Sequence, residues 1–268
     1  MHAHDRGLAY DVSQLVGRRR MLGLIAGAGL ASLVGCSTQS GTSSTASATS
    51  AGAATGTAAC GADIPEETAG PFPGDGSNGP NALTQSGIVR RDIRSSFGGA
   101  SGTAGGVPLT INLTVQDRPK GCAPLVGAAV YLWHCTQDGR YSLYSQGVTG
   151  ENYLRGVQEA DSNGAVTFTS IFPAAYSGRW PHIHFEVYPS LASAAAQRGK
   201  ITTSQLALPQ DVCAAVYATD GYAGSVQNLA RTSLASDMVF RDGYQSQLAA
   251  VSGSVSSGVV ASLAVPVS

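Results

Sequence analysis

Charge, histidine and long apolar runs are scarce in this chain of 268 residues. Only 12% of the residues are charged, 16 basic against 17 acidic, and no basic cluster occurs after residue 36. This balance excludes nucleic acid as an expected partner. The apolar run over residues 21–34 is shorter than the roughly 20 residues of a membrane-spanning helix. Helical periodicity is also scarce, and no internal repeat is visible.

The first 35 residues have the pattern of an export signal. Arg18, Arg19 and Arg20 precede a mildly apolar run that ends in Leu-Val-Gly-Cys at Cys36. Twin arginines and this cysteine predict a Tat-type lipoprotein signal peptide over residues 1–35, with Cys36 lipidated. An ordinary signal peptide cut nearby, with Cys36 incidental, is the alternative. We therefore expect an exported, lipid-anchored protein of the cell envelope that touches membrane only through Cys36.

Residues 36–59 are dominated by Ser, Thr, Ala and Gly. Such a segment lacks the apolar area needed to offset the entropy of ordering and is expected to be a flexible tether. The remaining residues, 60–268, are enough for one domain with a substantial core. Beyond Cys36 the charge balance is 12 basic against 15 acidic residues, because four arginines and two aspartates precede it.

Four cysteines follow the leader: Cys60, Cys122, Cys135 and Cys213. An even number in an exported chain predicts two disulfides, and the sequence leaves all three connectivities open. Zinc is the rival use of these thiols. It is disfavoured because no Cys-x-x-Cys spacing occurs.

Strand patterns dominate residues 60–268. Leu109 to Gln116 alternates apolar and polar residues, and Ala128 to Cys135 is apolar on both faces, as in a central strand. The turn at residues 161–164 leads into a strand over 165–169, whereas 191–198 and 209–217 are expected to be short helices. The fold class is therefore mainly β, a two-sheet β-sandwich with long ordered loops and few short helices.

His182 and His184 form the most informative pair in the chain. Residues i and i+2 of a strand point to the same face, so both imidazoles can reach one ion while Ile183 enters the core. Only one other histidine, His134, follows the leader. The alternative is that His182 and His184 are simply partly exposed residues of a strand. The residues around the pair favour a metal site.

Two tyrosines, Tyr153 and Tyr176, occupy loops that can approach these histidines. A phenol has a pKa near 10, so it binds as phenolate only to a strongly Lewis-acidic cation such as ferric iron. Two phenolates, two neutral imidazoles and a hydroxide would balance Fe(III), which makes a buried site tolerable. A core or rim aromatic is the alternative for each tyrosine taken singly.

Several ordered motifs resemble the intradiol ring-cleavage dioxygenases, in particular the exported single-chain branch related to the protocatechuate 3,4-dioxygenase β chain. The resemblance covers roughly residues 60 to 245. Its motifs are Glu-Thr-Ala-Gly-Pro at 67–71, Val-Arg-Arg-Asp-Ile at 89–93, the run from 125 to 141, Tyr-Leu-Arg-Gly-Val-Gln at 153–158, Asp-Ser-Asn-Gly at 161–164 and Tyr-Ser-Gly-Arg-Trp-Pro-His-Ile-His at 176–184.

The resemblance implies a site and a reaction. It implies a non-haem Fe(III) centre held by Tyr153, Tyr176, His182 and His184. Tyr176 would also accept a proton from the substrate, Arg179 would stabilise negative charge on the ring, and Gln205 would support the site from behind. The substrate would be a small catechol-type diol, cleaved by O2 between its hydroxylated carbons to a cis,cis-muconate-type diacid. Homo-oligomer formation is left open.

Two other functions compete with this one. A Gly-Ala-Ala-Val strand followed by an Asp-Gly turn also resembles transthyretin-like binding modules of the cell envelope. Such a module would not need two tyrosines, Arg179 and both histidines together. A zinc hydrolase would require a carboxylate close to the histidines. Glu186 is the nearest candidate on the strand that carries His182 and His184.

Overall fold

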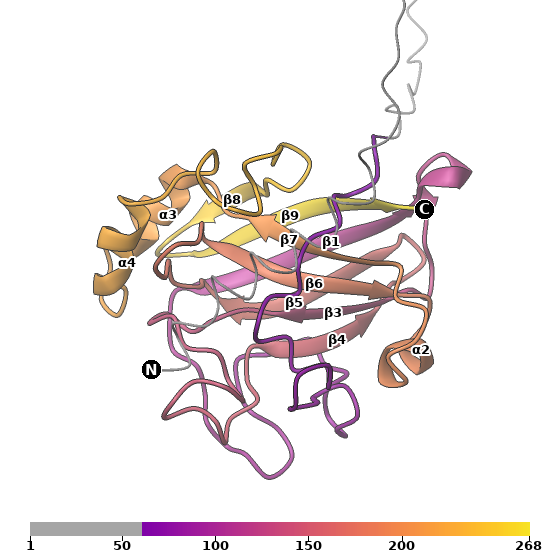
Figure 1. The fold of residues 1–268 in the computed structure, drawn as a ribbon, viewed down its shortest axis with the longest axis horizontal. Helices are drawn as coiled ribbons and strands as arrows, with labels where there is room; N and C mark the ends of the chain where they lie inside the picture. The colour runs from indigo at the N-terminus through magenta and orange to yellow at the C-terminus, as the bar shows by residue number, and fades with distance from the viewer. Residues whose placement is uncertain (1–60) are drawn as a thin grey trace, which may run out of the picture.

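The computed structural model describes residues 61–268, and the predicted signal peptide and tether lie outside them. Two sheets pack face to face, with loops gathered at the ends of the strands (Figure 1). The predicted β-sandwich is therefore confirmed. The first sheet contains β1 (Pro108–Asp117), β2 (Ala123–Pro124), β5 (Ala165–Ile171), β8 (Ala250–Ser254) and β9 (Gly258–Val267). The second contains β3 (Ala129–Trp133), β4 (Arg155–Glu159), β6 (His182–Tyr188) and β7 (Thr202–Ala207).

Strand β1 is the organising strand of the first sheet. It pairs antiparallel with β5, Ile111 opposite Phe168, and parallel with β9, Ile111 opposite Ala261. Its alternating burial follows the predicted alternation, with Leu109, Ile111, Leu113 and Val115 buried. The pattern therefore sends one face of β1 into the core and leaves the other half-exposed.

The second sheet has the order β4-β3-β6-β7, and all its described neighbours are antiparallel. Trp133 of β3 lies opposite Arg155 of β4 on one side and opposite His184 of β6 on the other. Every residue of β3 and β6 is buried, as expected for central strands covered on both faces. This register brings the end of β3 beside the start of β6.

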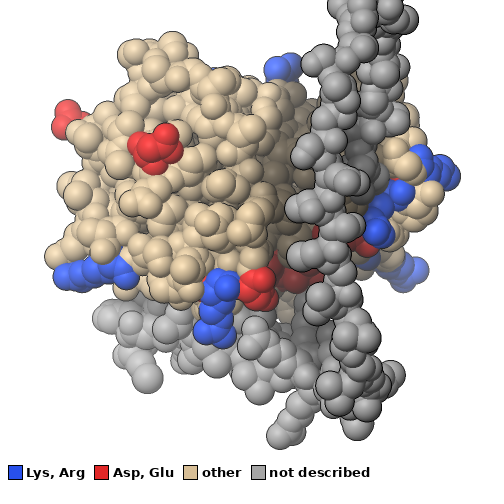
Figure 2. All heavy atoms as spheres, turned by 90° about the horizontal axis from the view of Figure 1, so that it is seen from above, with Lys and Arg blue, Asp and Glu red and all other residues tan. Residues whose placement is uncertain are grey.

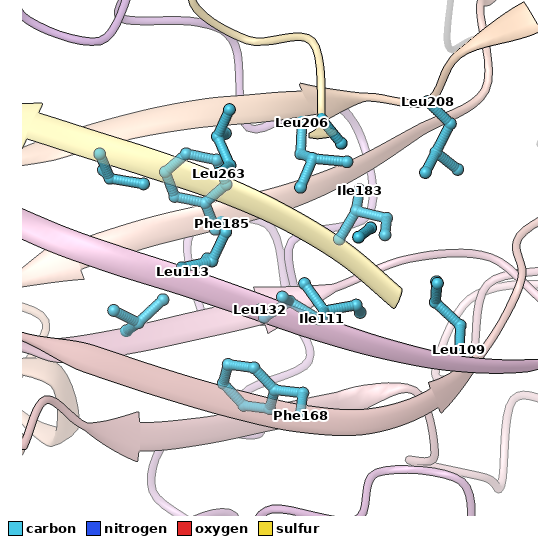
Figure 3. Close-up of a cluster of buried hydrophobic side chains, with 14 of the residues drawn as sticks. Leu109, Ile111, Leu113, Leu132, Phe168, Ile183, Phe185, Leu206, Leu208 and Leu263 are labelled. Carbon is cyan, nitrogen blue, oxygen red and sulfur yellow. The ribbon is translucent and has the colours of Figure 1, made fainter. Parts of the chain in front are cut away.

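The main core lies between the two sheets (Figure 3). Phe168 and Ile111 from the first sheet meet Leu132, Ile183 and Phe185 from the second, and all five are fully buried. Ile183 therefore enters the core, and its two histidine neighbours point to the opposite face of β6. That opposite face carries the candidate site.

Short helices lie outside the sheets. The helices α2 (Leu191–Ala195) and α3 (Gln210–Tyr217) match the two predicted ones, and α4 (Ala223–Leu229) follows α3. Within residues 61–268, a 3-10 turn covers Arg118–Lys120. In Figure 1, α3 and α4 lie together at one end of the sandwich and α2 lies at the other.

The buried guanidinium of Arg155 joins the loops at one edge of the second sheet. It donates to the carbonyls of Phe72, Pro73 and Ser142, and to the hydroxyls of Tyr131 and Ser142, at 2.8 to 3.2 Å. These acceptors come from three segments far apart in sequence. A buried guanidinium is tolerable only when its N–H groups have hydrogen-bond acceptors. Moving any of these segments away would leave an N–H group of Arg155 without its acceptor, so Arg155 holds the segments together.

The prediction of two disulfides is wrong. Cys122 is disulfide-bonded, but Cys135 and Cys213 are free and buried, and Cys60 lies outside the described residues. The Cys135 thiol lies 3.7 Å from the Ala174 carbonyl oxygen, and burial raises its pKa to about 12. Both thiols occupy apolar packing positions, where cysteine acts as a small hydrophobic residue.

The surface carries few charges. On the face shown in Figure 2, uncharged area covers most of the surface, and some basic and acidic side chains lie side by side. Within residues 61–268, no helix combines the length and apolarity required to cross a bilayer.

Candidate metal centre

Strand β6 presents two buried imidazoles to one point. The Nε2 atoms of His182 and His184 are 3.0 Å apart, and both side chains are almost completely buried. Nδ1 of His182 lies 2.5 Å from the carbonyl oxygen of Trp180. Because a carbonyl only accepts, we assign the proton of neutral His182 to Nδ1, which leaves the Nε2 lone pair pointing at His184.

The His184 ring is fixed between strand and loop. Trp133 stacks on it, with ring centroids 4.9 Å apart and planes 5° apart. On the loop side, a Cβ atom at Gly70 would come 3.3 Å from Cε1 of His184, so only glycine leaves this approach unhindered. Nδ1 of His184 has no hydrogen-bond partner among the described residues. The ring is therefore positioned by packing.

Tyr176 and Tyr141 extend the histidine pair. The Tyr176 hydroxyl is 3.1 Å from Nε2 of His182 and 3.3 Å from the hydroxyl of Tyr141. The Tyr141 ring also meets the His184 ring edge to face, with centroids 6.3 Å apart. Two phenols and two imidazoles thus form a continuous set of neighbours, and we call these four residues the ligand cluster.

Tyr153 has a different location. It packs with Ala104, Val148, Leu154 and Ile171, in an apolar group separate from the one that contains Tyr141 and Tyr176. It precedes β4, which lies beyond β3 from the histidine strand. Two strand spacings amount to about 10 Å. The structure therefore brings together Tyr176, His182 and His184 of the predicted ligands, and it puts Tyr141, not Tyr153, beside them.

Tyr141 is not among the predicted ligands, although the sequence carries a signal for it. Tyr141 follows β3 after the Asp138-Gly139 turn, and β3 pairs with the histidine strand. Residues just past the end of β3 must therefore lie near the start of β6. Strand pairing, not the number of residues separating a tyrosine from the histidines, identifies the neighbour.

Arg179 and Gln205 are in contact beside the histidine strand. Nη2 of Arg179 donates to Oε1 of Gln205 at 2.6 Å, and Nε donates to Oδ2 of Asp237 at 3.0 Å. Gln205 is opposite His184 in the β6–β7 pairing and also donates to the Thr68 carbonyl at 2.9 Å. The two predicted residues are thus in contact, and Asp237 is a partner that sequence analysis did not find.

Burial controls the electrostatics of the ligand cluster. Desolvation, followed by the charge of Arg179, lowers the pKa of His182 well below its ordinary value, and desolvation also lowers that of His184. Burial, and then Tyr176, raises the pKa of Tyr141 well above the ordinary phenol value. The protein alone therefore keeps both imidazoles and the Tyr141 phenol neutral. Neutral imidazole is the form that binds metal.

The spacing of the donor atoms fits a shared ion. Ligand atoms about 2.1 Å from one cation lie about 3.0 to 3.4 Å from each other in octahedral or tetrahedral arrangements. The consecutive separations in the ligand cluster are 3.3, 3.1 and 3.0 Å. Two phenols among four donors favour a hard, strongly Lewis-acidic cation, as Fe(III) is.

The zinc hydrolase reading has no support in the described residues. No group of three or more His, Cys, Asp or Glu side chains in residues 61–268 is placed to hold a metal. Glu186 is fully buried and accepts hydrogen bonds from Tyr188 at 2.7 Å and Lys200 at 2.8 Å. Its carboxylate is therefore engaged at the other end of β6.

Comparison with known proteins agrees with this architecture. A family model described as "Dioxygenase" matches residues 84–217, half of the chain. The chain is similar to a chlorocatechol 1,2-dioxygenase from Rhodococcus opacus, with 38% identity over 66 residues. That match covers 25% of this chain, which spans about a quarter (26%) of the length of that curated relative.

Among solved structures, the chain resembles an intradiol ring-cleavage dioxygenase from Tetranychus urticae. The TM-score is 0.57 at 23% identity, and the match covers 67% of this chain and 86% of the other. At this identity the likeness shows a shared fold.

Proposed function

Because this chain belongs to the intradiol ring-cleavage dioxygenase family, we propose that it cleaves a catechol-type aromatic diol between its hydroxylated carbons with O2, at a non-haem Fe(III) centre. The observation that carries the proposal is the ligand cluster, in which two phenol oxygens and two imidazole nitrogens are neighbours at 3.0 to 3.3 Å. The product would be a cis,cis-muconate-type diacid.

We propose Tyr141, Tyr176, His182 and His184 as the residues that hold the iron. Tyr141 replaces Tyr153 in the set implied by the sequence resemblance, because its hydroxyl is in contact with that of Tyr176. When bound, Fe(III) would supply the Lewis acidity that lets two phenols ionise and a diol bind as an anion. The proposal requires no charged histidine, in accord with the lowered pKa of both imidazoles.

The chain's own residues would then handle charge and protons. The Tyr176 oxygen, within 3.3 Å of both neighbouring ligand atoms, is placed to accept a proton from a diol hydroxyl. The buried Arg179 guanidinium, whose charge acts on both imidazoles, would stabilise negative charge that develops on the ring. Gln205 would hold Arg179 by accepting from Nη2.

The ring substituents of the substrate are not defined by these residues, and we propose only the catechol class. Oxygen uptake measured over catechol, protocatechuate, hydroxyquinol and chlorinated catechols would identify the preferred diol.

Export and lipid anchoring through Cys36 are likewise proposals, supported by the pattern of the leader. Cell fractionation of the wild type and of Cys36→Ala tests them, since only the wild type should sediment with membranes.

A colour assay tests the proposed centre. We expect the iron-loaded protein to absorb visible light through tyrosinate-to-iron charge transfer, and the band to shift when a catechol is added without oxygen. Tyr176→Phe should weaken the band and lower oxygen uptake by at least about 100-fold, because a ligand and a proton acceptor are lost together. His182→Ala should lower the iron content measured by elemental analysis.

Glu186→Gln provides the matched control, because this buried residue shares β6 with the histidines but faces Lys200. It should retain iron, colour and oxygen uptake. A wild-type protein that stays colourless after iron loading contradicts the iron centre. That result would favour the transthyretin-like binding module, in which the sandwich binds a ligand without catalysis.

A further inference from the structure

Asp237 is a buried carboxylate that contacts the proposed charge-stabilising arginine. Oδ2 accepts from Nε of Arg179 at 3.0 Å, and Oδ1 lies 3.5 Å from Nη2. The exposed fractions of the two side chains are only 5% for Arg179 and 0% for Asp237. Gln205 accepts from the same Nη2 at 2.6 Å. Acceptors from two separate segments thus hold one edge of a planar guanidinium, which fixes the direction of the whole group.

Backbone donors hold the carboxylate itself. Oδ1 accepts from the amides of Val239 at 2.8 Å and Phe240 at 3.2 Å, and Oδ2 accepts from the amide of Trp180 at 2.6 Å. Asp237 therefore belongs to a rigid turn and reaches across to the segment that leads into the histidine strand. It accepts hydrogen bonds from both the side chain of Arg179 and the backbone amide of Trp180.

Holding the turn at Val239 and Phe240 does not explain why residue 237 carries a negative charge. A neutral Asn or Ser side chain can accept from backbone amides in the same way. Burying an ion pair gives little or no net stability, because desolvation of both charges offsets their attraction. A full carboxylate is, however, the partner that matches a guanidinium edge in charge and geometry.

We propose that Asp237 is a positioning residue for Arg179, whose carboxylate aims the guanidinium at the ligand cluster. The proposal rests on the proposed function, because it assigns Arg179 to charge stabilisation in ring cleavage. Its structural part, the orientation of Arg179 by Asp237, can be tested without activity. Sequence position gives no hint of the pair, since 58 residues separate its members.

The variant Asp237→Asn separates positioning from simple support. An amide of the same shape has one oxygen and one NH2 group. If its oxygen faces Val239 and Phe240, its NH2 group opposes the donors of Arg179 and Trp180, and the reverse orientation opposes the turn. One set of contacts is lost in either case. The two amides of the turn should keep the oxygen, which places the NH2 group against Nε of Arg179.

Kinetics of the iron-loaded full chain provide the first readout. We expect Asp237→Asn to lower kcat about 100-fold with catechol and to change KM by less than about threefold, because stabilisation of developing charge acts in the transition state. The charge-transfer band of the resting protein should be unchanged. Arg179→Gln should lose at least as much kcat.

The double variant reports whether the two residues act together. If Asp237 acts through Arg179, adding Asp237→Asn to Arg179→Gln should lower kcat by less than about threefold more. A purely structural role predicts independent, multiplied losses. The control Glu186→Gln removes another fully buried, ion-paired carboxylate and should keep kcat within about twofold.

Nuclear magnetic resonance supplies the readout that does not depend on activity. In the iron-free protein, the Nε–H signal of Arg179, identified by its loss in Arg179→Gln, should be protected from exchange in the wild type and lose protection in Asp237→Asn. Unchanged protection would overturn the proposal whether or not any catechol is cleaved. Unchanged kcat in Asp237→Asn, or multiplied losses in the double variant, would also overturn it. An inactive wild type would refute the proposed function, and the Arg179 signal would still decide the positioning.

Discussion

At the scale of single residues, the sequence identified most of the side chains that the structure brings together. His182, His184 and Tyr176 lie within a nine-residue segment, so their proximity follows from local geometry. Strand alternation alone places both imidazoles on one face. The contact of Arg179 with Gln205 agrees with the site implied by the resemblance.

The fourth member of the ligand cluster shows where residue-level reasoning stopped. Tyr153 and Tyr141 both precede the histidines on loops, and sequence distance does not distinguish them. Tyr141 follows β3, the direct partner of β6, whereas Tyr153 precedes β4, one strand further away. Only sheet order separates the two candidates, and sheet order depends on pairings between distant segments.

Paired phenylalanine variants test this assignment. Tyr141→Phe should lose a large part of the charge-transfer absorbance of the iron-loaded protein, because one of two phenolate donors is removed. Tyr153→Phe deletes the same atom from a ring packed against Val148 and Ile171, so its visible spectrum should match the wild type. Absorption spectra at equal iron content provide the measurement. The reverse pattern would return Tyr153 to the ligand set.

At the scale of elements, the alternating strand β1 and the histidine strand β6 were predicted, whereas the alternating strand β9 and the mainly polar strand β7 were not. The predicted strand from Leu109 to Gln116 is confirmed as Pro108–Asp117, and the strand at 165–169 extends to Ile171. Strand β7 carries mainly polar residues and is nevertheless wholly buried. Its Ser204 and Gln205 donate to the carbonyls of Pro65 and Thr68, so tertiary contacts satisfy polar groups that a sequence pattern assigns to solvent.

The turn before β5 depends on one glycine. Gly164 has φ of +72°, and a Cβ there would lie 2.4 Å from the Val115 carbonyl oxygen. Gly164→Ala should therefore lower the free energy of unfolding by about 2 kcal/mol or more, through backbone strain and displacement of β1. Urea denaturation measures the change.

Gly150→Ala is the matched control, because nothing lies within 4 Å of a Cβ there and no positive φ opposes it. Its free energy of unfolding should stay within about 0.5 kcal/mol of the wild type or rise slightly. Equal destabilisation by both substitutions would show that the turn does not constrain β1.

At the scale of the whole molecule, the sequence predicted the sandwich but not its cysteine chemistry. An even count of thiols suggested pairing, whereas the fold uses Cys135 and Cys213 as buried packing groups. Composition records how many thiols exist, and only the fold decides which of them meet.

A buried carboxyl should make the stability of the whole molecule depend on pH. Burial, and then Asp242, raises the pKa of Glu67 from 4.5 to about 8. Asp237 adds to this rise, whereas Gln247 and Arg179 oppose it. Between pH 4.5 and about 8 this carboxyl therefore binds more protons in the folded chain than in the unfolded chain, so its own contribution to the free energy of unfolding falls as pH increases. The slope contributed by Glu67 is at most about 1.4 kcal/mol per pH unit.

Urea denaturation at pH 5, 6, 7 and 8 measures this dependence. Glu67→Gln should remove this negative contribution, so its slope should be more positive than that of the wild type, because an uncharged amide stands where the folded protein holds a protonated carboxyl. Glu66→Gln changes the exposed neighbour and should leave the slope as it is in the wild type. A slope in Glu67→Gln that equals the wild-type slope would show that Glu67 does not contribute to the pH dependence.

The parallel pairing of β1 with β9 sets a lower limit on when the first sheet can be completed. Leu109 lies opposite Val259, so β1 must wait for about 150 further residues to be synthesised before its neighbour exists. Until then one flank of β1 offers unpaired amides and carbonyls, the kind of surface on which chains associate wrongly. A nascent chain stalled before β9 should therefore be the species most prone to aggregate or to recruit chaperones.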